Sequence, residues 1–149
     1  MNASKIVIVL MAGILLLAGC APKPSAGDAE SEIQFRISDS LKLISLEKTD
    51  GQDGQIQNAQ GMVVPSYSLE YGADLEATQR CEVLPNEIDE TGGFLTAYSL
   101  ADGGAPIFTN NVLESGQHLQ INGTVLFEKT EKGWRENHIT IYPVGTTLP

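Results

Sequence analysis

Three carboxylates on one face of a predicted strand are the first candidates for chemistry in this sequence. Residues 67–77 alternate between apolar and polar side chains, which is typical of an antiparallel strand with one solvated face. The polar face carries Glu70, Asp74 and Glu76. Neighbouring side chains on such a face lie about 7 Å apart, and paired carboxylates can serve acid–base catalysis or bind a cation. A solvated face that resists edge pairing is the simpler interpretation, and we favour it.

Two histidines and an acidic segment offer possible metal ligands. His118 and His138 lie on the two strands of a predicted hairpin and would form half of a metal site if they met, but the chain has no third histidine. In residues 50–54, Asp-Gly-Gln-Asp-Gly, the acids are three apart. Calcium loops instead place acids at alternate positions and close with a distal Glu. We therefore predict no metal and no cofactor, with exposed histidines and a polar turn at 50–54.

Cys81 is one of two cysteines, the other being Cys20. It shares the odd numbering of the apolar face of residues 67–77, which predicts a buried thiol; an intermolecular disulfide and a reactive nucleophile are the alternatives. The chain has no Gly-x-Ser-x-Gly, His-Glu-x-x-His, Cys-x-x-Cys or phosphate-binding glycine loop. We therefore predict no catalytic residue.

Cys20 ends an apolar run at the N-terminus. Residues 6–17 are apolar and follow Lys5; this length suits a secretion signal and is too short for a bilayer, which needs about 20 residues. The run closes with Leu17-Ala18-Gly19-Cys20, which resembles the lipobox of bacterial lipoproteins at all four positions. An ordinary secretion signal with a chance cysteine is the alternative.

The lipobox resemblance implies a lipid anchor. Leu17, Ala18 and Gly19 would be recognised by the lipoprotein signal peptidase, residues 1–19 would be removed, and the Cys20 thiol would carry a diacylglyceryl group. Two or three acyl chains hold a protein stably on a membrane surface. Position 21 is Ala rather than the Asp that retains lipoproteins at the inner membrane. The resemblance therefore implies the periplasmic face of the outer membrane if the organism is Gram-negative.

The segment after the anchor predicts a tether. Residues 20–32 contain two prolines, small residues and acids, which is typical of a flexible linker. Stretched, it would reach about 40 Å, so the domain could sit beside the membrane or turn away from it. Residues 33–149 predict one globular domain.

The domain contains several predicted strands and one predicted helix. Residues 33–41 fit either a helix or a strand, and we favour a short helix before Ser38. Residues 41–48 predict a strand, 49–61 a loop, 94–100 a strand and 107–113 a strand or short helix.

A hairpin is predicted towards the C-terminus. Leu119, Ile121, Val125 and Phe127 are all odd-numbered, which predicts one strand passing straight through Asn122-Gly123, with a possible bulge at Gly123. Residues 130–133 predict the turn that leads to a partner strand at 134–142.

These elements predict an α+β domain on a curved antiparallel sheet with a short N-terminal helix; an all-β sandwich is the alternative. Residues 48–52 and 123–134 resemble a family of uncharacterised exported bacterial proteins. That resemblance covers about residues 40–142 and implies one structural unit without an activity.

The net charge of −10 over 149 residues argues against nucleic acid as a partner and against a polybasic hold on anionic lipid. We expect a non-catalytic accessory or binding protein of the cell envelope, attached to the membrane through Cys20 and with an envelope protein as partner. A small envelope hydrolase that uses Glu70, Asp74 and Glu76 is the alternative.

Overall fold

The structure is a computed structural model that describes residues 21–84, 87–89, 92–100 and 103–147. A helix, α1 (Ala26–Arg36), comes first, and four long strands follow: β1 (Leu41–Gln57), β2 (Val63–Ala77), β8 (His118–Thr130) and β9 (Gly133–Thr147). Between β2 and β8 lie β3 (Cys81–Val83), β4 (Glu87–Asp89), β5 (Gly92–Phe94), β6 (Ala97–Ser99), the short 3₁₀ helix η1 (Thr109–Asn111) and β7 (Val112–Leu113).

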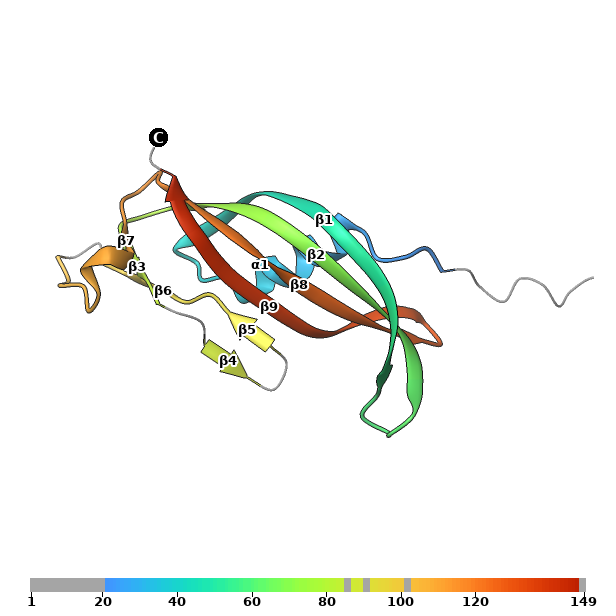
Figure 1. Cartoon of the computed structure of the whole chain (residues 1–149). Coiled ribbons are helices and arrows are strands. Elements are labelled where there is room, and N and C mark those ends of the chain that lie inside the picture. The colour runs from blue at the N-terminus through green and yellow to red at the C-terminus, as the bar shows by residue number, and fades with distance from the viewer. Residues whose placement is uncertain (1–20, 85–86, 90–91, 101–102, 148–149) are drawn as a thin grey trace, which may run out of the picture.

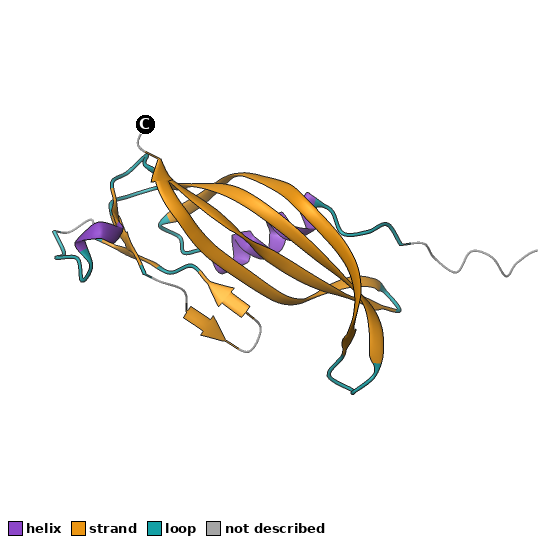
Figure 2. Cartoon of the chain, viewed as in Figure 1, coloured by secondary structure: helices purple, strands orange, loops and turns teal. Residues whose placement is uncertain are grey.

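The long strands form a curved sheet with the helix against one face (Figures 1 and 2). The order in the larger sheet is β1-β2-β8-β9-β5-β4, and a separate small sheet has the order β6-β3-β7. The predicted curved antiparallel sheet and N-terminal helix are both present, although β5 meets β9 in parallel at Gly92 and Ile139. Strands hold 61% of the described residues and helices 12%, so the fold is sheet-dominated and nearer to the all-β alternative.

The two ends of the larger sheet differ. At one end lie the β1–β2 loop (58–62) and the β8–β9 turn (131–132), and we call this the turn end. The small sheet follows the last residue of β2 and precedes the first residue of β8, so it lies at the opposite end, the small-sheet end (Figure 1). Since β8 has 13 residues, the two ends are about 40 Å apart along the strands.

Alternation places the core on the helix-facing side of β2 and β8. Tyr67, Leu69, Tyr71, Ala73, Leu75 and Ala77 are all buried, and so are Leu119, Ile121, Val125 and Phe127. The single strand through Asn122-Gly123 is therefore confirmed. The register irregularities of the β8–β9 pair lie between Gln120 and Ile121 and between Leu126 and Phe127, so the possible bulge at Gly123 is wrong.

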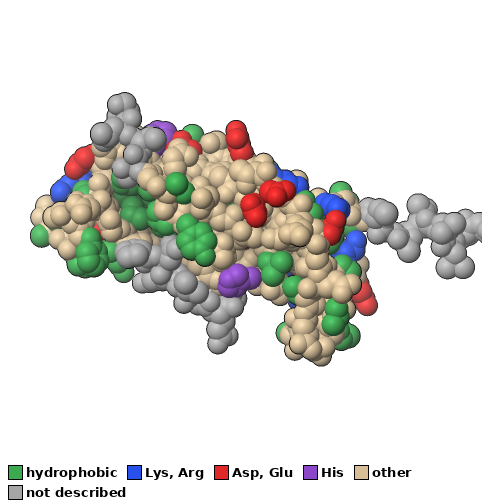
Figure 3. All heavy atoms as spheres, viewed as in Figure 1, with side chains coloured by type: hydrophobic (Ala, Val, Ile, Leu, Met, Phe, Trp, Pro, Cys, Tyr) green, Lys and Arg blue, Asp and Glu red, His purple; other side chains and the backbone are tan. Residues whose placement is uncertain are grey.

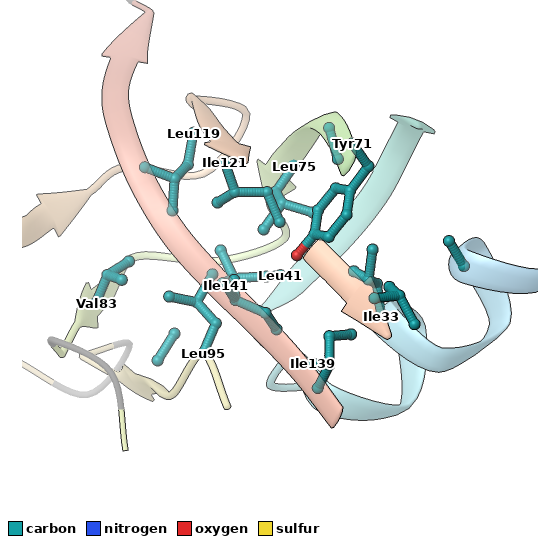
Figure 4. Close-up of a cluster of buried hydrophobic side chains, with 14 of the residues drawn as sticks. Ile33, Leu41, Tyr71, Leu75, Val83, Leu95, Leu119, Ile121, Ile139 and Ile141 are labelled. Carbon is teal, nitrogen blue, oxygen red and sulfur yellow. The ribbon is translucent and has the colours of Figure 1, made fainter. Parts of the chain in front are cut away.

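Gly123 instead allows a close approach between strands. A Cβ at this position would lie 1.9 Å from the Thr140 carbonyl oxygen and 2.6 Å from the Tyr71 hydroxyl oxygen. The Tyr71 hydroxyl crosses Gly123 and donates a hydrogen bond to the Thr140 carbonyl at 2.8 Å. Burial raises the pKa of Tyr71, so this hydroxyl keeps its proton. Figure 4 shows the Tyr71 ring among the aliphatic side chains of the core.

The helix begins earlier than predicted and takes up residues 26–32 of the predicted tether. The Asp28 carboxylate accepts hydrogen bonds from the Ser25 amide and the Ser25 hydroxyl, both at 2.7 Å, and these bonds lower the pKa of Asp28. Ala29 and Ile33, one turn apart, are fully buried against the sheet. The composition of residues 20–32 resembles a linker, but Ser25 and Asp28 form a helix start and Ala29 and Ile33 form the buried face of that helix.

β1 is also longer than predicted, because residues 49–57 continue the strand instead of forming a loop. Backbone pairing with β2 runs from Leu41–Ala77 to Gln57–Val63. Most side chains of residues 49–57 are exposed, so polar residues and glycines are tolerated where neither face must be apolar. The polar turn predicted at residues 50–54 is therefore wrong, since these residues lie within β1.

Candidate functional site

Two of the three predicted carboxylates gather around a histidine on the outer face of the sheet. Asp74 accepts a hydrogen bond from Gln120 at 2.6 Å and lies 2.7 Å from His118 Nδ1. Glu76 lies 4.0 Å from His118 Nε2. Glu70 lies further along β2, opposite Thr124, and is exposed. The structure therefore joins His118 to Asp74 and Glu76 and leaves Glu70 apart.

An oriented histidine of this kind can act as a general base, because the carboxylate at Nδ1 fixes the ring and leaves Nε2 to accept a proton. Here, however, Nε2 faces Glu76 on an open strand surface. The structure has a groove at the start of β1 and another at the turn end, and neither is lined by Asp74, Glu76 or His118. Across residues 21–84, 87–89, 92–100 and 103–147, no three His, Cys, Asp or Glu side chains are grouped to hold a metal ion.

The two histidines do not meet. His138 pairs with Leu126, eight residues along β8 from His118, which is about 27 Å at the rise of a strand. Cys81 is fully buried and is a free thiol, as predicted, and burial raises its pKa. A reactive thiolate at Cys81 is therefore disfavoured.

The lipobox residues Leu17, Ala18, Gly19 and Cys20 lie outside the described residues. In the part of the chain that is described, no helix has the length and apolar character needed to cross a bilayer.

A buried carboxylate organises a second feature at the small-sheet end. Glu82, in the middle of β3, is only 2% exposed. It accepts hydrogen bonds from the backbone amides of Ile107, at 2.8 Å, and Phe108. In the small sheet Glu82 lies opposite Tyr98 of β6. One carboxylate therefore holds the 107–108 backbone close to the strand that carries Tyr98.

The side chains around this carboxylate are exposed and apolar. Tyr98 is 50% exposed, Ile107 73% and Phe108 51%, and we call these three residues the distal patch. Hydrophobic side chains gather at the small-sheet end in Figure 3. Large apolar side chains grouped on a surface often mark a protein interface, whereas single ones need no explanation. No pattern in the sequence indicated the patch, because Glu82 is about 25 residues from the amides that it binds.

A groove of about 620 Å³ marks the turn end of the sheet. Met62, Val64 and Trp134 contribute its apolar lining, and its charged lining comes from Glu128, Lys129, Glu131, Lys132 and Arg135. Arg135 is paired with the buried Glu128. The Lys129 ammonium lies 5.1 Å from the centre of the Trp134 ring. A smaller groove, about 310 Å³, lies at the start of β1 and is lined by Ile37, Leu41 and Lys42 among others.

No family model, curated protein or solved structure matches this chain.

Proposed function

We propose that this chain is a bacterial lipoprotein that is held on a membrane surface through Cys20 and that binds an envelope protein through the distal patch. In a Gram-negative organism the membrane would be the outer one, at its periplasmic face. The observation that carries the binding role is the distal patch itself, three large exposed apolar side chains, two of which stand on backbone that the buried carboxylate of Glu82 holds.

The energetics of the patch favour a rigid binding surface. Exposing two aromatic rings and an isoleucine to water is unfavourable, and covering them recovers roughly 25 cal/mol for each Å² of apolar area. A surface already ordered before binding loses less conformational entropy when the partner arrives. Two amide hydrogen bonds to Glu82 supply that order at residues 107 and 108.

The anchor is tested by metabolic labelling with a radioactive fatty acid. The wild-type chain should carry label and enter the detergent phase, because a diacylglyceryl group on Cys20 makes it amphipathic. Cys20→Ser should carry no label and migrate as the larger, uncleaved precursor. An unlabelled wild-type protein would refute the lipoprotein assignment.

The binding role is tested by photo-crosslinking in intact cells, with a photoreactive amino acid at position 107. The crosslinked partner should be lost when Phe108→Asp is added, because a charge at the patch opposes burial. Phe35→Asp is the matched control, since Phe35 is 81% exposed and belongs to α1, a different element from those that carry the patch. If both aspartate variants retain the crosslink, or both lose it, the patch is not the binding surface.

A second candidate function, a small envelope hydrolase, is favoured by the contact between Asp74 and His118. In it, His118 would act as the general base and Asp74 would orient the imidazole. The test is hydrolysis of a panel of chromogenic esters and glycosides by the purified protein, compared with His118→Gln. A hydrolytic rate that His118→Gln leaves unchanged, or no hydrolysis by the wild type, would reject this function.

A further inference from the structure

The N-terminal segment of the described chain is fixed at the turn end. Lys23 Nζ lies 2.5 Å from the Asp53 carboxylate and 5.5 Å from the centre of the Tyr67 ring, and Pro24 is buried. Asp53 and Tyr67 pair with each other across β1 and β2, and Tyr67 pairs with Phe127, close to the β8–β9 turn. In Figure 1 the blue N-terminal segment leaves the domain at this end.

Cys20 is only three residues before Lys23. Three residues span at most about 11 Å, far less than the reach of about 40 Å that a tether of residues 20–32 would give. If Cys20 carries the lipid, the turn end is therefore the part of the domain nearest to the bilayer, and the distal patch lies on the opposite side.

The turn end also carries side chains suited to a lipid surface. Met62 and Val63, at the β1–β2 loop, are 58% and 68% exposed. Five of the nine Lys and Arg residues of the chain lie at the groove or beside Tyr67: Lys23, Lys48, Lys129, Lys132 and Arg135. In Figure 3 most of the basic side chains in view lie towards this end, with acidic side chains among them.

Acids lie at this end too, and the exposed Glu131 lines the groove next to Lys132 in the β8–β9 turn. Asp53 is paired with Lys23, and Glu128 with Arg135. Lys132, exposed at the β8–β9 turn, has no ion-pair partner within the described ranges. Lys129 and Lys132 therefore face only Glu131 among the unpaired charges of the groove. This small local excess of positive charge lies beside an apolar loop, a combination that interfacial segments use on anionic bilayers.

We propose that the turn end docks on an anionic phospholipid surface, with Met62 and Val63 at the headgroup level and Lys129 and Lys132 at the lipid phosphates. The proposal rests on the lipid anchor at Cys20. It gives the domain one orientation, in which the distal patch projects about 40 Å from the bilayer, within reach of a partner.

Trp134 reports on this orientation, because it lines the groove and is the only tryptophan in the chain. The full, lipidated protein is reconstituted in vesicles of zwitterionic lipid with about one-third phosphatidylglycerol, and lipids with a spin-label quencher on the headgroup are added. Trp134 fluorescence should be quenched. A probe at the small-sheet end, made by combining Trp134→Phe with Phe108→Trp, should be quenched much less.

Charge variants separate docking from simple attachment. Lys132→Glu should lower the docked-to-undocked ratio by at least about fivefold, since each cation near an anionic surface contributes about that factor. Met62→Ser should also weaken the quenching of Trp134. Lys42→Glu is the matched charge reversal, on an exposed residue at the small-sheet end of β1.

Vesicle flotation is measured on the same samples. A protein that floats but shows equal quenching at both tryptophan positions overturns the docking proposal and leaves the anchor intact. A protein that does not float overturns the anchor, and the docking proposal with it.

Discussion

Replacing Glu82 by Gln tests whether one buried carboxylate orders the distal patch. Glu82 accepts amide hydrogen bonds from Ile107 and Phe108 through different carboxylate oxygens. Glutamine keeps one acceptor oxygen and presents an NH₂ group where the second oxygen was. One backbone N–H would therefore face another donor in a buried site.

An unpaired buried donor costs about 1–3 kcal/mol, which corresponds to roughly a 5- to 150-fold change in an equilibrium constant. The neighbouring side chains at 103–110 are mostly exposed, so the segment can detach without unfolding the sheet. We therefore expect local opening at 107–108 to increase by about this factor, while the free energy of global unfolding falls by no more than about 3 kcal/mol.

Amide hydrogen exchange followed by NMR measures this opening directly. In Glu82→Gln the amides of Ile107 and Phe108 should lose protection, and the patch-dependent crosslink should weaken in parallel. Glu114→Gln is the control, because Glu114 belongs to an exposed ion pair with Arg80 that is worth about 0–1 kcal/mol. Unchanged exchange at both amides in Glu82→Gln would show that the carboxylate does not hold the segment.

Three further predictions concern the stability and packing of the fold. Gly123→Ala should lower the free energy of unfolding in urea by about 2–4 kcal/mol, from overpacking together with the lost Tyr71 hydrogen bond. Gly145→Ala is the control, because the Cβ position of Gly145 has open space around it, and it should change the free energy of unfolding by less than about 0.5 kcal/mol. Equal effects of the two substitutions would contradict a close approach at Gly123. The hydrogen bonds from Ser25 lower the pKa of Asp28. The charged carboxylate therefore stabilises the fold at pH values above its ordinary pKa of 3.8, and this stabilisation is lost as the pH falls through the lowered pKa. The stability difference between wild type and Asp28→Asn should therefore shrink in acid, and a constant difference would exclude a role for this charge. Cys81 should react with a thiol reagent far more slowly in the folded protein than in urea, as followed by intact mass, and rapid modification of the native protein would show that the site opens.

Local patterns were enough to predict the main sheet. Alternation over residues 67–77 predicted most of β2 (Val63–Ala77) and its buried face, because side chains in a strand point to opposite faces in turn. The odd numbering of Leu119, Ile121, Val125 and Phe127 predicted one strand where the Asn122-Gly123 dipeptide alone would indicate a turn. Both predictions depend only on near neighbours in the chain.

Composition was a weaker guide where polar residues form regular structure. Residues 49–57 are mostly polar because both faces of that part of β1 meet solvent, and their strand is held by backbone bonds to β2. Residues 26–32 have the composition of a linker, yet Ala29 and Ile33 bury one helix face. In both segments tertiary pairing outweighed intrinsic preference.

The sequence by itself determined the proposed anchor and the alternating faces of the long strands, since a lipobox and a period of two are properties of adjacent residues. Only the tertiary structure decided which side chains meet. Glu82 binds amides about 25 residues away, Asp74 meets His118 across two strands, and Lys23 reaches Asp53. Such contacts are set by strand register and by the path of the chain between elements, and neither leaves a pattern in the residues that make the contact.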